Sequence, residues 1–328
     1  MEMRPFGKSG IQVSGIGIGT WQIGGQWGPE FTDETALEIL RAAADQGVTF
    51  IDTADIYGLG RSETVIGKFL RENRGNFFVA TKLGRNPHPG WPHNFTPRVI
   101  REHTENSLLN LGVDCLDLTQ LHCVPQEELE SGVVFEALED LKQAGKIRNY
   151  GASVESMEEA LICLRYPGCA SLQIIFNIFR QKPISTLFDQ AQRQGVAIIV
   201  RLPLASGLLS GKMTKDRVFD ENDHRNYNRD GQQFNVGETF AGLPYEAGVD
   251  LANQVAALVP PGMTMTQMAL RWCLDFDAVT TVIPGARSPE QAIENSQAGH
   301  LPRLPSPLHD RLAALYHTEV EPLIRGKY

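Results

Sequence analysis

Features typical of several protein classes are absent from this chain of 328 residues. The five cysteines are Cys115, Cys123, Cys163, Cys169 and Cys273. No two form a CxxC pair, and an odd number of scattered thiols favours reduced cysteines in a cytosol over a disulfide framework. No apolar run reaches the ~20 residues that a membrane helix needs, and the N-terminus holds no apolar stretch of signal-peptide length. We therefore expect a cytoplasmic protein.

The chain also lacks a basic block. Its net charge is −9, which makes nucleic acid or an anionic membrane surface an unexpected partner. Hydrophobic residues make up 42% and charged residues 21%, as in ordinary soluble globular proteins. The length allows one large α/β barrel or two ordinary domains. The sequence leaves the oligomeric state open, a homo-oligomer included.

Short β-rich runs alternate with amphipathic helical stretches along the chain. The predicted strands are Gly15–Gly19, Thr49–Asp52, Phe77–Lys82, Leu116–His122, Asn149–Ser153, Leu172–Phe176, Val196–Arg201 and Thr280–Pro284. The predicted helices are Asp33–Gln46, Ser62–Arg71, Thr96–Leu111, Glu127–Gln143, Ser156–Leu164, Ile184–Gln194, Thr266–Leu274 and Pro289–Gln297. Capping residues support several of these bounds, with Asp33 as the N-cap of the first helix, a capping residue at the second and Pro97 in the first turn of the third.

Eight strand–helix units predict an α/β protein with a closed parallel (β/α)8 TIM barrel, which needs about 250 residues plus insertions. An open doubly wound sheet is the main alternative. No linker or change in composition divides the chain, so residues 1–328 are expected to form a single domain. Arg4–Val13 predicts a hairpin that caps the bottom of the barrel. Pro307–Ile324 predicts an extra C-terminal helix near the opposite rim.

Two irregular stretches, Gly84–Asn94 and Leu202–Tyr245, are too long for plain connections. Both follow the C-terminal ends of predicted strands, where barrel enzymes build their sites. Loops of this length in a compact domain are usually functional or disordered. We therefore expect both stretches to border a site.

Four proton-handling side chains lie at or just beyond successive strand ends: Asp52, Tyr57, Lys82 and His122. Strand alternation gives Lys82 the same face as Phe78 and Ala80 and, on the next strand, gives His122 the same face as Leu118 and Gln120. If these faces point inward, the four groups meet at the top of the barrel. Each residue alone has an ordinary structural explanation, but the joint pattern predicts a catalytic site.

The chemistry of the four groups is complementary. A carboxylate at Asp52 keeps a partly buried Lys82 charged, and the ammonium is expected to lower the pKa of the Tyr57 phenol from about 10. Tyr57 is then able to exchange a proton near neutral pH, while His122 orients the same substrate oxygen. This set suits protonation of a carbonyl oxygen while a hydride arrives at its carbon.

Other sequence patterns carry less weight. Gly15, Gly17 and Gly19 do not meet the GxGxxG spacing of a dinucleotide loop, and no acidic partner follows at the usual distance. His88 and His93 lack a clustered third ligand, so no metal site is predicted. Cys123 follows His122 but is expected to be a buried, inert thiol.

With these motifs in place, the chain resembles the aldo-keto reductase superfamily over nearly its whole length. The resemblance is carried by the hairpin, Gly19-Thr20-Trp21, Asp52-Thr53-Ala54 through Tyr57-Gly58, Arg61-Ser62-Glu63, Lys82, Leu121-His122, Gly145-Lys146-Ile147-Arg148, Gly151-Ala152-Ser153, Gln173 to Asn177, Pro203-Leu204, Ser206-Gly207-Leu208-Leu209, Ile283-Pro284-Gly285-Ala286-Arg287 and Glu294-Asn295.

The resemblance implies a (β/α)8 barrel that binds NADP(H) in an extended form, with Asp52, Tyr57, Lys82 and His122 as the catalytic tetrad. Tyr57 is the implied general acid of reduction and base of the reverse reaction. The implied cofactor-binding residues are Thr20, Trp21, Asp52, Ser153, Gln173, Arg201, Pro203, Leu204, Ser206, Gly207, Lys212, Arg225, Gly285, Ala286, Arg287, Gln291, Glu294 and Asn295. Among these, Ser153 and Gln173 correspond to contacts of the nicotinamide carboxamide, and Leu204 to Gly207 correspond to the pyrophosphate loop. Gly285 to Arg287, with Gln291, Glu294 and Asn295, correspond to the adenosine end.

The adenosine end has its own physical rationale. Ser288-Pro289 opens a helix whose N-terminus favours a phosphate, and the planar fork of Arg287 suits a 2′-phosphate. Lys212 and Arg225 are expected to close over the phosphates. These residues favour NADP over NAD.

Three positions depart from the family pattern. Arg201 stands where many members stack an aromatic ring on the nicotinamide, although a guanidinium plane also stacks. Val154 replaces an asparagine, which removes one carboxamide contact. Gln291 stands where some relatives carry a phosphate-binding arginine, which weakens the expected NADP preference.

The substrate pocket is predicted to be walled by Trp21, Trp27, Trp91 and Ile56, which suits aromatic aldehydes and sugars. We expect an NADP(H)-dependent enzyme that reversibly reduces an aldehyde or ketone, with the small carbonyl or alcohol substrate as its partner. Two alternatives stay open: a dehydrogenase that oxidises a sugar or polyol, and an NADP(H)-sensing subunit with little turnover.

Overall fold

The barrel is formed by eight short parallel strands. The computed structural model describes residues 1–24, 32–73 and 75–328. The strands are β3 (Ile18–Gly19), β4 (Phe50–Asp52), β5 (Phe78–Leu83), β6 (Leu116–His122), β7 (Ile147–Ser153), β8 (Cys169–Ile175), β9 (Ala197–Arg201) and β10 (Val279–Val282), paired in chain order. Parallel bridges from Ile16 to Val282 and from Gly19 to Gly285 join the two edges. The predicted barrel is confirmed, and the open-sheet alternative is wrong.

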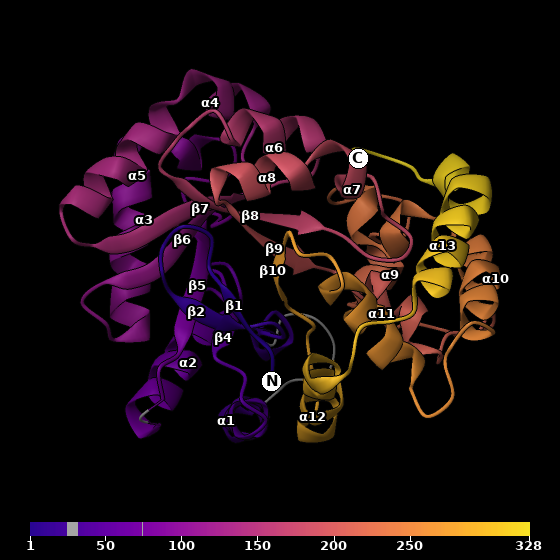
Figure 1. Cartoon of the computed structure of the whole chain (residues 1–328). Coiled ribbons are helices and arrows are strands. Elements are labelled where there is room, and N and C mark those ends of the chain that lie inside the picture. Colours follow the sequence, from indigo (N-terminus) through magenta and orange to yellow (C-terminus); the bar gives the residue numbers. More distant parts are fainter. Residues whose placement is uncertain (25–31, 74) are drawn as a thin grey trace.

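Helices follow each strand and surround the sheet (Figure 1). They are α1 (Asp33–Asp45), α2 (Arg61–Glu72), α3 (Pro97–Leu111), α4 (Gln126–Ser131), α5 (Val133–Gln143), α6 (Met157–Cys163), α7 (Pro183–Thr186), α8 (Phe188–Gln194), α9 (His224–Tyr227), α10 (Tyr245–Ala256), α11 (Met265–Leu274), α12 (Pro289–Gln297) and α13 (Ser306–Leu315). The helices α1 and α12 lie side by side, as closure of the ring requires. Among the described residues, no helix combines the length and apolar character needed to span a membrane.

Local backbone chemistry explains where the helix predictions differ from the structure. The N-cap of α1 is Thr32, which accepts the backbone N–H of Thr35, so the prediction of Asp33 is wrong. The N-cap of α2 is Gly60, which has φ 90° and no side chain that could accept a hydrogen bond from the helix. The predicted capping residue of this helix is therefore wrong too. Gly132, with φ 78°, divides the stretch predicted as one helix into α4 and α5.

Three further helical stretches differ. The predicted helix over 184–194 is interrupted at Leu187 into α7 and α8. The C-terminal helix α13 ends at Leu315 and continues as a π-helical turn, Tyr316–Val320. The sequence patterns do not predict α10, which carries a glycine in its interior. That glycine, Gly248, packs so closely on Leu208 that a Cβ would lie 2.8 Å from the leucine side chain.

The bottom of the barrel is closed by aromatic packing. The predicted hairpin is confirmed as β1 (Met3–Pro5) and β2 (Gln12–Ser14), and its turn carries Phe6 into the interior. The Phe6 ring lies 4.6 Å from that of Phe78, which lies 5.5 Å from that of Phe50. This burial removes apolar surface from water and stabilises the barrel at this end. Polar side chains gather at the opposite end.

Candidate active site

A buried lysine lies at the centre of the polar groups at the top of the barrel. Lys82, on β5, donates from Nζ to Asp52 Oδ1 at 2.6 Å, to the Thr53 carbonyl at 2.8 Å and to Tyr57 Oη at 3.2 Å. The side chains of Lys82 and Asp52 are 1% and 4% exposed. A buried charge is tolerated when it is paired and hydrogen-bonded. Here all three ammonium protons have acceptors.

Strand pairing brings these groups together. Asp52 ends β4 and pairs with Ala80 of β5. Ala80 and Phe78 lie in the barrel interior, so alternation turns Lys82 to the same side. Tyr57 follows in a turn that packs on Gly24, where a Cβ would lie 2.8 Å from the Tyr57 carbonyl carbon. The close approach of the two backbones therefore requires glycine at this position.

His122, the last residue of β6, faces the same centre. Its ring lies edge-on to the Tyr57 ring, with 6.1 Å between centroids. Burial lowers the pKa of His122 well below its usual value, and the positive charges of Lys82, Arg85 and Arg201 lower it further. The imidazole is therefore neutral at pH ~7 and carries one N–H donor.

The acidity of Tyr57 differs from the sequence expectation. Burial raises the pKa of its phenol, Lys82 opposes this, and the Asp52 carboxylate raises the pKa further. The expected lowering is wrong because desolvation outweighs the ammonium. Burial alone lowers the pKa of Lys82, but its contacts with Asp52 and Tyr57 prevail and raise it. Both groups hold their protons at neutral pH.

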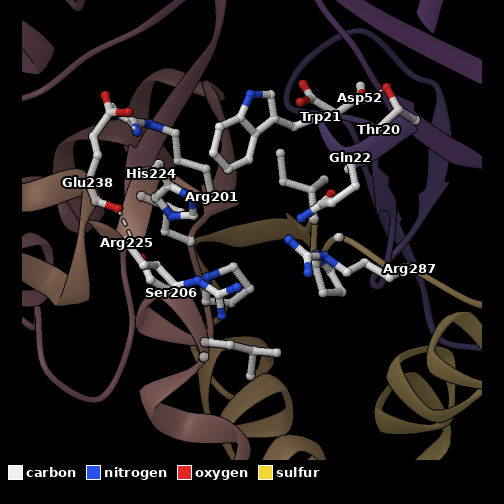
Figure 2. A pocket seen from close by; sticks show the side chains of 18 of the residues that line it. Thr20, Trp21, Gln22, Asp52, Arg201, Ser206, His224, Arg225, Glu238 and Arg287 are labelled. Carbon is white, nitrogen blue, oxygen red and sulfur yellow. Dashed lines mark hydrogen bonds and ion pairs between the residues drawn. The ribbon is translucent and has the colours of Figure 1, made fainter. Parts of the chain in front are cut away.

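One wall beside His122 is charged. Arg201, at the end of β9, forms an ion pair with Glu238 at 3.1 Å and donates to the Val154 carbonyl at 3.3 Å. Glu238 belongs to the long segment after β9, and Figure 2 shows both side chains on the same side of the cavity. Arg85 donates from Nε to the His122 carbonyl at 3.2 Å. The surroundings of His122 are therefore polar as well as aromatic.

A cleft of about 610 Å³ joins this centre to the start of α12. The predicted residues that line it are Thr20, Trp21, Asp52, Ile56, Tyr57, His122, Gln173, Arg201, Pro203, Leu204, Ser206, Gly207, Lys212, Arg225, Gly285, Arg287, Gln291, Glu294 and Asn295. Ser153 and Ala286 are buried beside it and do not line it. Trp91 is 52% exposed and also lies off the cleft, with its indole N–H donating to the Cys123 carbonyl. Trp27 lies outside the described residues.

Basic side chains enter the far end of the cleft from two walls (Figure 2). Arg225, on α9, is held by Asp223 through Nε at 2.9 Å and Nη2 at 2.5 Å. Arg287, just before α12, has its Nη2 3.8 Å from the same carboxylate. Its backbone N–H donates to Gln291 Oε1 at 2.8 Å. This end of the cleft offers cationic donors to an anionic group.

The family model described as "Aldo/keto reductase family" matches residues 15–317. The chain belongs to the aldo/keto reductase family. The aldo-keto reductase YhdN of Bacillus subtilis is 35% identical over 89% of this chain and 86% of its own. The L-glyceraldehyde 3-phosphate reductase of Escherichia coli is 32% identical over 91% of this chain and 87% of its own. The NADH-specific methylglyoxal reductase of Escherichia coli is 28% identical over 91% of this chain and 93% of its own.

Solved structures of family members share the fold. The holo form of an aldo-keto reductase from Bacillus halodurans superposes with a TM-score of 0.78, at 28% identity, over 96% of both chains. An aldo-keto reductase from Klebsiella pneumoniae in complex with NADPH gives a TM-score of 0.71, at 25% identity, over 96% of this chain and 95% of that one.

Several residues that line the cleft of this family member are not predicted from its sequence, including Gln22, Arg85, His224, Phe234 and Glu238. Arg85 follows a strand end closely, so the same positional rule that selects Lys82 also points to it. His224, Phe234 and Glu238 come from the long segment after β9, which has no periodic pattern. No sequence signal assigns their side chains to the cleft.

Three potential metal ligands meet near the charged wall. Within the described part of the chain, ligand atoms of Cys123, Glu155 and Glu238 lie within 4.8 Å of one another. Burial raises the pKa of the Cys123 thiol to about 11, and a protonated thiol is a poor ligand. Arg201 already pairs with Glu238. These observations favour an ion-pair network, with a buried thiol, over a cation site.

Proposed function

We propose that this chain is an NADP(H)-dependent oxidoreductase that reversibly reduces the carbonyl group of an aldehyde or ketone to an alcohol. The observation that carries the proposal is the buried contact of Lys82 with both Asp52 and Tyr57 at one end of a long cleft. This contact supports the proposal because it joins a protonated phenol to a fixed positive charge at the end of the cleft that the substrate oxygen would enter.

Each residue has a separate role in the proposed reaction. Tyr57 donates its proton to the carbonyl oxygen as hydride reaches the carbon. Lys82 stabilises the phenolate that forms, and Asp52 keeps Lys82 charged. The raised pKa of Tyr57 suits this direction because the acid is fully protonated at neutral pH. Neutral His122 is positioned to donate a hydrogen bond to the same oxygen.

The residues along the cleft fit a dinucleotide cofactor, which supplies the hydride. Ser153 Oγ and Gln22 Oε1 are buried and have no hydrogen-bond partner in the part of the chain that the structure describes, as expected for groups that serve a ligand. Gly285 packs so closely on Gln22 that a Cβ would lie 2.3 Å from Oε1. The basic end at Arg225 and Arg287 matches phosphate groups, and the family includes a structure with NADPH.

Gln173 donates to Asp52 Oδ2 at 2.8 Å, so we assign it both a support role and a place near the nicotinamide. The other proposed cofactor-binding residues are Thr20, Trp21, Asp52, Ser153, Arg201, Pro203, Leu204, Ser206, Gly207, Lys212, Arg225, Gly285, Ala286, Arg287, Gln291, Glu294 and Asn295. Ser153 and Ala286 require a small adjustment to reach the cleft, since both are buried next to it.

The charged wall favours a short, polar carbonyl substrate. Arg85, Arg201 and Glu238 line the cleft near His122. The buried Nε of Arg201 has no hydrogen-bond partner among the described residues, and an apolar ring placed against it leaves this donor unpaired. A hydroxylated substrate instead exchanges hydrogen bonds with these residues. Two relatives are named for L-glyceraldehyde 3-phosphate and methylglyoxal, both short and polar.

The test is NADPH consumption by the purified protein with glyceraldehyde, methylglyoxal, butyraldehyde and benzaldehyde. We expect turnover, with the first two favoured in kcat/KM by tenfold or more, about the discrimination of one unpaired buried polar group. Binding of NADPH without turnover of any carbonyl would instead support the sensing subunit. Efficient oxidation of polyols with negligible carbonyl reduction would support the dehydrogenase.

A further inference from the structure

A single carboxylate lies between the two arginines at the far end of the cleft. Asp223 accepts two hydrogen bonds from the Arg225 guanidinium, at 2.9 and 2.5 Å. Its Oδ2 is also 3.8 Å from Arg287 Nη2. The residue is 4% exposed. Two of the cations that line the cleft, which also include Lys212 and Arg217, therefore share one buried negative charge.

This carboxylate is fixed in place. Asp223 is the N-cap of α9 and accepts the Arg225 backbone N–H at 2.9 Å. The Arg225 guanidinium lies over the Phe219 ring, 4.6 Å from its centroid. Burial raises the pKa of Asp223, but hydrogen bonds from Arg225 outweigh it and lower the pKa to about 2. Asp223 stays charged at every pH at which the protein is expected to work.

Arg287 is the more available of the two cations. Its side chain is 39% exposed, against 13% for Arg225. Its contact with Asp223 is longer than a hydrogen bond, so it is able to turn toward a ligand. A phosphate beside Arg287 nevertheless meets the fixed charge of Asp223 a few ångströms away. Like charges at such a distance in a partly buried site repel appreciably.

We infer that Asp223 is a specificity-determining residue, which weakens the preference of this chain for NADPH over NADH. The inference rests on the proposed function. The mechanism is electrostatic: Asp223 offsets part of the positive charge that Arg225 and Arg287 present to a 2′-phosphate. A 2′-hydroxyl carries no charge, so NADH binding is not weakened in this way.

The test compares Asp223→Asn with Asp220→Asn. Asparagine remains a good N-cap and keeps its Oδ1 as an acceptor for Arg225 Nε, so D223N removes the charge together with the acceptor of Arg225 Nη2. Asp220 is an exposed acidic residue of the same segment. Burial lowers the pKa of Arg287. Both Asp223 and Asp220 oppose this lowering, and Asp223 does so more strongly. D220N is therefore the control for the loss of a nearby charge that solvent screens. Thermal unfolding checks that each variant folds. If D223N does not fold, Asp223→Ser retains an N-cap without the charge.

The readouts are dissociation constants of NADPH and NADH, from nicotinamide fluorescence, and of 2′-AMP and 5′-AMP, from calorimetry. In D223N we expect NADPH and 2′-AMP to bind about tenfold tighter, a modest charge–charge effect, with NADH and 5′-AMP changed less than about twofold. D220N is expected to change the ratio of NADPH to NADH affinity by less than about twofold, because solvent screens an exposed charge.

Three results overturn the inference: an unchanged ratio in D223N, weaker NADPH binding in D223N, or an equal shift in D220N. The second result means that Asp223 serves only to position Arg225. If the wild-type protein binds neither NADPH nor NADH, the proposed function itself fails. The two failures are therefore distinguishable.

Discussion

The two ends of the cleft are built in different ways. At the proposed catalytic end, Lys82 and Asp52 lie on strands and are 1% and 4% exposed. At the proposed phosphate end, Asp223 and Arg225 lie at a four-residue helix within a long segment, and Arg287 is 39% exposed. The difference indicates that strands fix the groups proposed for proton transfer, whereas a loop and a helix start carry the groups proposed for cofactor recognition, in regions that vary more among relatives.

The largest expected effect is at the catalytic end. Tyr57→Phe removes the proposed acid and should lower kcat/KM for carbonyl reduction by about 10³-fold, within the range for general acids. The dissociation constant of NADPH should stay within about twofold, because the hydroxyl acts on the substrate. Steady-state kinetics and cofactor fluorescence measure both quantities. Retention of most of the activity would mean that another group is the acid.

The next effect concerns stability. Lys82→Met leaves the Asp52 carboxylate buried without its cation, and breaking a buried pair in this way costs about 3–5 kcal/mol. Lys215→Met is the matched control, because Lys215 and Asp250 form an ion pair of 2.6 Å with side chains 49% and 58% exposed. Its loss should cost less than about 1 kcal/mol. Urea unfolding measures the free energy of unfolding of both variants. Similar decreases in Lys82→Met and Lys215→Met would contradict the different roles of the buried and the exposed ion pair.

The same contrast explains what could be predicted from the sequence. Strand alternation and the positions of strand ends are local properties, so the sequence alone is enough to bring Asp52, Lys82 and His122 to one end of the barrel. The predicted sign of the Tyr57 pKa shift is wrong because desolvation depends on burial by distant segments. Glu238 and His224 could not be assigned to the cleft because their positions depend on how an aperiodic segment of more than forty residues packs. The position of Asp223 beside Arg287 depends on the same packing.

A smaller effect concerns pH. Burial lowers the pKa of His224 to about 4, against about 6.5 in an unfolded chain. Between these values the unfolded state takes up a proton that the folded state excludes, so stability falls as pH decreases from about 6.5 to about 4. His224→Gln should reduce the decrease in the free energy of unfolding between pH ~7 and ~4.5 by about 2 kcal/mol. An unchanged pH dependence of urea unfolding would show that His224 is solvated.

The smallest effect is at the exposed arginine. Arg287→Ala should weaken NADPH binding about tenfold, the value of one charge-assisted hydrogen bond, and should change NADH binding less than about twofold. Arg303→Ala is a control for lost surface charge, since Arg303 pairs with Asp277. Equal losses of affinity for NADPH and NADH in Arg287→Ala would mean that Arg287 does not contact the 2′-phosphate.

In the proposed reaction, hydride passes from the cofactor to a carbonyl carbon in this cleft. Mass spectrometry of glycerol formed from glyceraldehyde with NADPH that is doubly deuterated at the nicotinamide C4 follows this transfer. We predict one deuterium per product molecule, on the former carbonyl carbon. Glycerol without deuterium, or no glycerol from a protein that binds NADPH, would contradict this prediction.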